Sequence, residues 1–66
     1  RWTRFHEAVG GLPEDERQVV NLLWYAGLSQ PEAAAAINVS LATLKRRWQA
    51  ARLRLCERLG GGGPEA

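Results

Sequence analysis

The chain has 66 residues, of which 45% are hydrophobic and 24% charged, which is the composition of a single small globular domain. A domain of this length buries only about 60% of the surface that its unfolded chain exposes, so it has no room for an enclosed substrate cavity, and an enzyme is disfavoured. The net charge of +2 is unevenly distributed: residues 13–27 carry three acidic and one basic residue, whereas residues 40–59 carry six basic and one acidic residue. Such a basic segment is an electrostatic signature of binding to a polyanion.

Several further classes of protein are disfavoured by what the chain lacks. No apolar run approaches the roughly 20 residues that cross a bilayer, and the charges within residues 1–11 exclude a signal peptide, so no membrane association is expected. Cys56 is the single cysteine, which excludes an internal disulfide or a zinc site of several thiolates and agrees with a cytoplasmic location. No pattern indicates a metal, a cofactor or catalysis. Because methionine is absent, we expect the chain to be a segment of a longer protein.

Helices are the only regular structure predicted, since nothing alternates with the period of a β-strand. In chain order, Trp2, Phe5 and Val9 have the spacing of one face of a short first helix, which ends at Gly10-Gly11. We interpret this segment, residues 1–11, as a lead-in to the main domain.

A second helix is predicted to open at Leu12-Pro13, because a proline at the first helical position loses no hydrogen bond. Three acidic residues follow where the helix dipole favours negative charge, and Gly27 suits the end of the helix. The acidic run Glu14–Glu16 is therefore explained by the helix N-terminus rather than by a catalytic acid pair. The apolar face of this helix comprises Val19, Val20, Leu22, Leu23 and Trp24.

A third helix starts with a capping box, in which Ser29 is the N-cap and Glu32 follows three residues later. Pro31 is tolerated in the first turn. The alanines that follow are strong helix formers whose small side chains let another helix approach closely, and the helix reaches about Ile37. Asn38 is then predicted to adopt the left-handed conformation that a tight turn requires.

The fourth helix is the longest and is predicted to run from about Leu41 to Leu59, with Ser40 as its N-cap. Apolar residues at spacings of three and four form a buried stripe along it: Leu41, Leu44, Trp48, Ala51 and Leu55. Away from this stripe lie Lys45, Arg46, Gln49, Arg52 and Arg54. Residues 60–66 are rich in glycine and are predicted to be a disordered tail.

The sequence therefore predicts an all-α fold, a bundle of three or four short helices, whose last two helices form a helix-turn-helix within residues 12–59. Capping by Ser40 leaves the amides of a helix N-terminus where they can approach a DNA duplex. Side chains in the first two turns then reach base edges, where Lys45 and Arg46 can donate to guanine and Gln49 can pair with adenine.

Short runs within residues 12–59 carry a resemblance to a known family. They are Leu12-Pro13, Glu16-Arg17 with Val19, Gly27–Ala34, Asn38–Ser40, Thr43–Arg47, Ala51-Arg52 and Leu55. Together they resemble region 4 of the sigma-70 family, most closely its extracytoplasmic-function (ECF) type, in which glycine is commonest at the place of Asn38. The resemblance implies a fold of the homeodomain-like or winged-helix-like DNA-binding class. It also implies recognition of the −35 promoter element in double-stranded DNA, and docking on the RNA polymerase β-subunit flap. An anti-sigma factor is a further candidate partner, and we expect the isolated domain to be a monomer.

The resemblance also implies which residues contact DNA. The bases or the adjacent backbone would be met by Lys45, Arg46, Gln49 and Ala50. Ser29 and Gln30 would lie near phosphates, and Arg47 and Arg52 would contact phosphates or brace the helix. The complete expected set is Ser29, Gln30, Ser40, Ala42, Thr43, Lys45, Arg46, Arg47, Gln49, Ala50 and Arg52.

Other conspicuous residues receive structural interpretations. Trp2 and Trp24 are expected to pack in the core, because each lies at helical spacing with aliphatic residues. His6 has no metal-ligating partner at suitable spacing, so a surface or packing role is expected. Cys56 follows the buried face at Leu55 by one position and is expected to be half buried.

Two other functions stay open from the sequence. The DNA-binding domain of LuxR-type or response-regulator activators shares the Gly27–Ser29 start but usually dimerises through its final helix, and the Arg47-Trp48 pair and the Ala51-Arg52 ending favour the sigma family. The other alternative is a helix-turn-helix that serves only as a protein-interaction module. The intact basic face argues against such a module, which would show no salt-dependent binding to DNA.

Overall fold

The computed structural model describes residues 2–60, apart from the side chain of Trp2. Residues 61–66 of the predicted tail at 60–66 and the predicted core position of the Trp2 side chain therefore lie outside the described residues. Between residues 2 and 60 all regular structure is helical, which confirms the predicted all-α fold. The elements in chain order are α1 (Trp2–Gly10), α2 (Glu14–Val20), the π-helical turn η1 (Asn21–Tyr25), α3 (Gln30–Ala36) and α4 (Leu41–Arg58).

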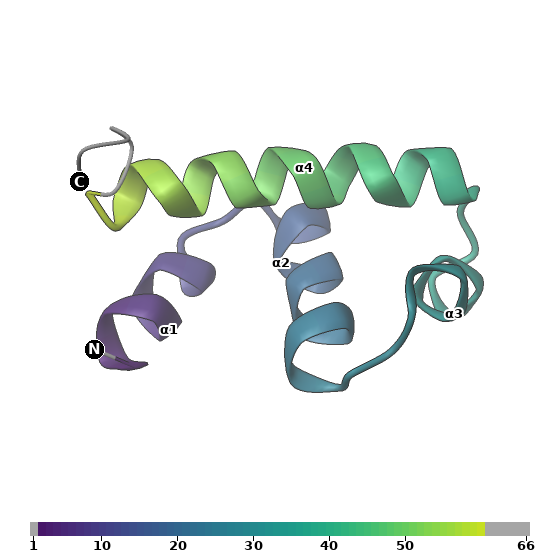
Figure 1. Cartoon of the computed structure of the whole chain (residues 1–66), viewed down its shortest axis with the longest axis horizontal. Helices are drawn as coiled ribbons and strands as arrows, with labels where there is room; N and C mark the ends of the chain where they lie inside the picture. The colour runs from purple at the N-terminus through teal and green to yellow at the C-terminus, as the bar shows by residue number, and fades with distance from the viewer. Residues whose placement is uncertain (1, 61–66) are drawn as a thin grey trace.

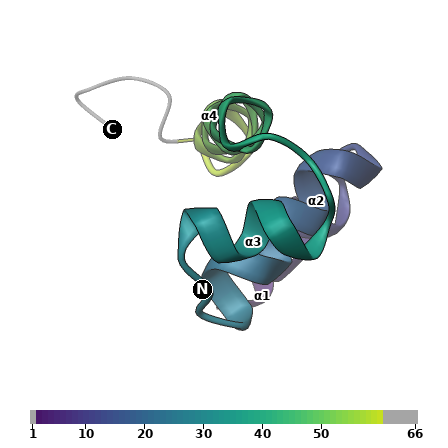
Figure 2. The ribbon, with the colours of Figure 1, turned by 90° about the vertical axis from the view of Figure 1, so that its right-hand side faces the viewer.

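The long helix α4 forms one layer, and the three shorter helices lie together on one side of it (Figure 1). Seen nearly along its axis, α4 forms the upper layer and the other helices form the layer beneath it, with α2 toward one side (Figure 2). The molecule measures 35 × 21 × 18 Å, and the 18 residues of α4 correspond to about 27 Å at about 1.5 Å per residue. Helix α4 is thus the common support on which α1, α2 and α3 all pack.

The core consists of two groups of buried side chains along the inner side of α4. One group joins α1 and α2 to the C-terminal half of α4 and includes Val20, Ala51 and Leu55. The other joins α2 and α3 to the N-terminal half of α4 and includes Val19 and Leu44. Because Val19 and Val20 are neighbours in α2 but belong to different groups, α2 links the two halves of the core.

The predicted apolar stripe of α4 is confirmed over most of its length. Leu44, Ala51 and Leu55 are buried, and Trp48 packs half buried against both groups. The prediction for Leu41 is wrong, since this side chain is 39% exposed. Leu41 is the first residue of α4, one turn before the first buried position at Leu44, and it is less completely covered than the residues of the stripe that follow it.

The second helix differs from its prediction because it changes type after Val20 and continues as η1. A π-helical turn bonds residue i to residue i+5, as the Ala26 N–H does to the Asn21 oxygen at 2.9 Å, and this widens the turn. The side chains that follow rotate off the buried line of α2. The core prediction for Trp24 is therefore wrong, and its side chain is 53% exposed.

Smaller differences concern the ends of the helices. Pro13 is the N-cap of α2 rather than its first residue, because its ψ of 154° is extended. Gly27 has the positive φ of 75° expected at the end of the second helix. Cys56 is exposed rather than half buried, because successive helical residues point about 100° apart and Leu55 occupies the buried direction.

Candidate nucleic-acid interface

A tight turn between α3 and α4 sets the direction in which α4 leaves the bundle. Asn38 has a φ of 59°, which confirms the predicted left-handed conformation. Its N–H donates to the Ala35 oxygen at 3.2 Å, and the Val39 N–H donates to the Ala34 oxygen at 3.0 Å. This pair of hydrogen bonds is the Schellman motif, which satisfies the last carbonyls of a helix. The turn is therefore held by backbone hydrogen bonds rather than by side chains that could vary with sequence.

The first turn of α3 contains the predicted capping box. The Ser29 N–H donates to the Glu32 Oε1 atom at 2.8 Å, and the Glu32 N–H donates to the Ser29 Oγ atom at 3.2 Å. The backbone N–H of Ser29, and secondarily its side chain, lower the pKa of Glu32. Ser29 is exposed and Gln30 is half buried. Both residues, which are expected to contact phosphates, therefore lie at the start of α3.

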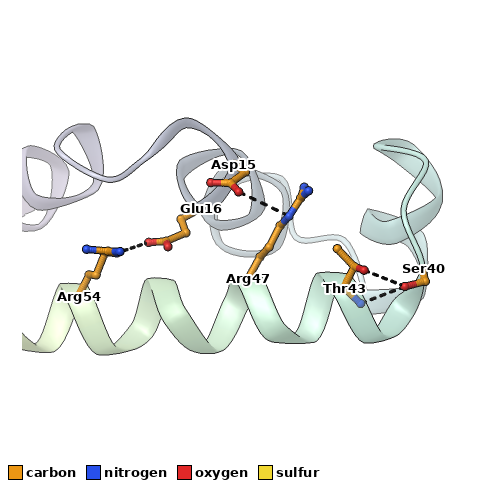
Figure 3. A network of polar contacts seen from close by, with 6 residues as sticks. All are labelled: Asp15, Glu16, Ser40, Thr43, Arg47 and Arg54. Carbon is orange, nitrogen blue, oxygen red and sulfur yellow. Dashed lines mark hydrogen bonds and ion pairs between the residues drawn. The ribbon is translucent and has the colours of Figure 1, made fainter.

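The first turn of α4 is fixed by the predicted N-cap. The Ser40 Oγ atom accepts the Thr43 N–H at 3.1 Å and donates to the Thr43 Oγ1 atom at 3.0 Å (Figure 3). Because both hydroxyls are engaged with each other, the Thr43 side chain is held close to the helix end. These hydrogen bonds thus fix the first turn of α4, which lies at one end of the bundle.

Most of the residues expected at the DNA lie on α4, and the exposed ones among them point away from the core. Arg46 follows the buried Leu44 by two positions, or about 200° around the helix, and so points away from the core. The exposed members of the expected set on α4 are Ala42, Lys45, Arg46, Gln49 and Arg52, and the half-buried ones are Thr43, Arg47 and Ala50. The fold thus gathers a basic and amide-bearing surface at the first turns of its longest helix.

The acidic run at the start of α2 does more than complement a helix dipole. Asp15 Oδ2 lies 3.7 Å from Arg47 Nε, and Glu16 Oε1 lies 2.9 Å from Arg54 Nε (Figure 3). Glu16 is buried, with 7% of its surface exposed, and its Oε1 atom accepts no directed hydrogen bond among the described residues. Its contact with Arg54 is therefore an ion pair, and α2 is joined to α4 by charge as well as by apolar packing.

These contacts divide the six basic residues of α4 into engaged ones, whose side chains interact with another group of the protein, and unengaged ones, whose side chains do not. Besides the two paired arginines, the Arg58 Nη2 atom donates to the Gly11 oxygen at 3.2 Å, and the Arg52 guanidinium lies 6.0 Å from the centre of the Trp48 ring. Lys45 and Arg46 have no ion pair or side-chain hydrogen bond within residues 2–60. The sequence did not predict this division, because its basic residues look alike until α2 and α1 pack against α4.

An apolar groove lies on α4 beyond the first turns. It has a volume of about 220 Å³ and is lined by Phe5, Val20, Trp24, Trp48, Arg52, Leu55 and Cys56. The rings of Phe5 and Trp24 are 5.4 Å apart, so α1 and η1 together form its outer wall. Sequence reasoning missed this groove, because it placed Trp24 in the core and because the groove exists only where α1, α2, η1 and α4 meet.

Within residues 2–60, no helix is long and apolar enough to span a membrane, and no cluster of three or more potential ligand side chains could hold a metal ion. In a comparison with protein families, the model described as sigma-70, region 4, matches residues 2–55. This match starts ten residues before Leu12, so it includes α1. No curated protein and no solved structure shows significant similarity to the chain.

Proposed function

From the membership of the chain in the sigma-70 region 4 family, whose members bind DNA in promoter recognition, we propose a function with two parts. Helix α4 reads the −35 promoter element, and the apolar groove binds the flap of the RNA polymerase β subunit. The family match decides between the two DNA-binding families that the sequence left open. The runs shared with ECF sigma factors support assignment to that type. We further propose that the domain is monomeric and cytoplasmic, and that an anti-sigma factor can bind it.

The observation that carries the DNA-reading proposal is the exposed and unengaged outer side of α4. The major groove of B-DNA is about 12 Å wide and admits one α-helix. Arg46 supplies donors that fit the O6 and N7 atoms of guanine, and the Gln49 amide fits the N6 and N7 atoms of adenine. Lys45 lies beside them on the helix, where it meets the adjacent phosphate backbone. The capped start of α3, with Ser29 and Gln30, then supports the approach to the phosphates.

The groove supports the second half of the proposal. Trp24 is 53% exposed, and large exposed aromatic side chains are enriched at protein interfaces. The groove is separated along α4 from Lys45 and Arg46, and of the residues expected at the DNA only Arg52 lines it, so a polymerase segment can bind there while the first turns of α4 contact DNA. A flap helix that presents apolar side chains would cover Trp24 and Phe5.

Selection from a random duplex library, followed by fluorescence anisotropy with the enriched sequence, tests the DNA half. We expect an enriched motif, and we expect Gln49→Ala to reduce discrimination against one base pair by about 1–3 kcal/mol. Leu53→Ala is the matched control, since Leu53 is 64% exposed on the same helix and carries no hydrogen-bonding group. The proposal would be refuted by a library that yields no motif, or by a Gln49 variant that discriminates as well as the control.

NMR titration of the ¹⁵N-labelled chain with a synthetic β-flap helix tests the other half. We expect shifts at Phe5, Trp24 and Trp48 but not at Lys45 or Arg46. Trp24→Ala should abolish these shifts and leave DNA binding intact. If the flap helix shifts nothing at high excess while DNA still does, the polymerase assignment is wrong and the chain acts as a free-standing DNA-binding domain.

A further inference from the structure

Apart from Arg46, which points away from the core, the basic residues in the middle of α4 form two matched pairs that point to opposite flanks of the helix. Lys45 and Arg47 are two positions apart, which is about 200° around the helix, and the same holds for Arg52 and Arg54. Residues seven positions apart point in nearly the same direction. One flank therefore carries Lys45 and Arg52, and the other carries Arg47 and Arg54.

The flank with Arg47 and Arg54 faces α2 and is electrically compensated. Arg47 lies 3.7 Å from Asp15 and Arg54 lies 2.9 Å from Glu16, and both carboxylates belong to the start of α2 (Figure 3). The Asp15 side chain is 54% exposed, so its charge acts on solvent next to α4. A phosphate brought to this flank would lie within the Debye length of about 8–10 Å of both carboxylates as well as of both arginines, whose charges cancel, so it would gain little net attraction.

The opposite flank has no carboxylate partner among the described residues. Lys45 is exposed and unengaged, and Arg52 is exposed and rests against the face of the Trp48 ring at 6.0 Å. A guanidinium held over an aromatic ring keeps its charge and its N–H donors, so Arg52 is positioned to bind a phosphate without first breaking an ion pair.

From this asymmetry, and on the basis of the DNA-binding function proposed above, we infer that α4 contacts the phosphate backbone through the Lys45–Arg52 flank alone. Asp15 and Glu16 act as negative determinants that close the other flank to DNA. They thereby fix on which side of α4 a phosphate strand runs, and Arg47 and Arg54 are positioning residues that hold α4 on α2.

The salt dependence of binding to a fixed duplex separates the two flanks, because each phosphate contact adds about 0.9 to the slope of log Kd against log salt concentration. We expect Lys45→Ala and Arg52→Ala each to lower the slope by about 1. The matched variants Arg47→Ala and Arg54→Ala should leave the slope unchanged. Asp15→Asn should raise the slope by about 1, because it releases Arg47 and removes the repulsive charge.

Equal losses of slope in the two matched pairs would overturn the inference, as would an Asp15→Asn variant whose slope does not rise. A merely structural role of Asp15 would lower the melting temperature measured by circular dichroism without moving the slope. A wild-type chain that binds DNA without salt dependence would instead refute the proposed function itself, and the inference with it. The two failures are therefore distinguished by the wild-type titration alone.

Discussion

The left-handed residue in the turn of the helix-turn-helix offers a direct test of what holds α4 in place. Asn38 has a φ of 59°, a conformation that places a Cβ atom too close to the following carbonyl oxygen and costs roughly 1–2 kcal/mol for most residues. Asparagine tolerates it because its short side chain bonds locally to the backbone. Alanine lacks this tolerance, so replacing Asn38 by alanine adds backbone strain while the two backbone hydrogen bonds of the turn stay in place.

We expect Asn38→Ala to lower the free energy of unfolding by about 1 kcal/mol. In a domain of this size such a loss lowers the melting temperature by about 4–8 °C. Asn38→Gly should stay within about 0.5 kcal/mol of the wild type, because the relief of backbone strain is offset by the greater freedom of glycine in the unfolded chain.

Thermal unfolding followed by circular dichroism measures all three chains. Asn21→Ala is the matched control, because Asn21 is exposed and has a right-handed φ of −59°; alanine, the better helix former, should leave stability equal or raised there. The reasoning would be refuted if Asn38→Ala melted with the wild type, or if Asn38→Gly lost as much stability as Asn38→Ala.

Three further perturbations have expected outcomes. Leu44→Ala removes a side chain with no exposed surface and should cost about 2–5 kcal/mol in denaturant unfolding, whereas Leu53→Ala, at 64% exposed, should change stability by less than about 0.5 kcal/mol. Gly27→Ala should lower stability by about 1–2 kcal/mol, although no atom lies within 4 Å of the added Cβ, because φ is 75°; an unchanged melting point would contradict this. The pKa of Glu32 is lowered, first by the Ser29 N–H, so the ionised carboxylate stabilises the folded state at any pH above the ordinary glutamate pKa of about 4.3. This stabilisation is lost as the pH falls below that value. Glu32→Gln should therefore flatten the acid limb of the stability–pH curve, and an unaltered limb would show that the capping box is not coupled to protonation.

Most of the helical framework could be predicted because its signals are local. The capping box of Ser29 and Glu32, the N-cap at Ser40 and the left-handed Asn38 each depend on hydrogen bonds within a few residues. The stripe through Leu44 and Leu55 follows from the period of the helix alone. Such features need no knowledge of what packs against them.

Local signals failed where the outcome depended on a neighbouring element. Trp24 shares the apolar pattern of the second helix, but the π-helical turn rotates it outward, and no pattern in residues 21–25 distinguished this turn from an α-helix. Leu41 continues the stripe of α4 by spacing, yet 39% of its surface stays exposed at the start of the helix. Burial is a property of what lies opposite a side chain, which spacing along one helix does not contain.

The sequence by itself determined an all-α helix-turn-helix with a basic last helix, because propensity, capping and periodicity act over a few residues. Only the tertiary structure decided which cations of that helix stay available. Asp15 and Arg47 are far apart in the chain, as are Glu16 and Arg54, and they meet because α2 packs on one flank of α4. Electrostatic pairing depends on distance through space, so equal residues in the sequence became unequal only when the helices assembled.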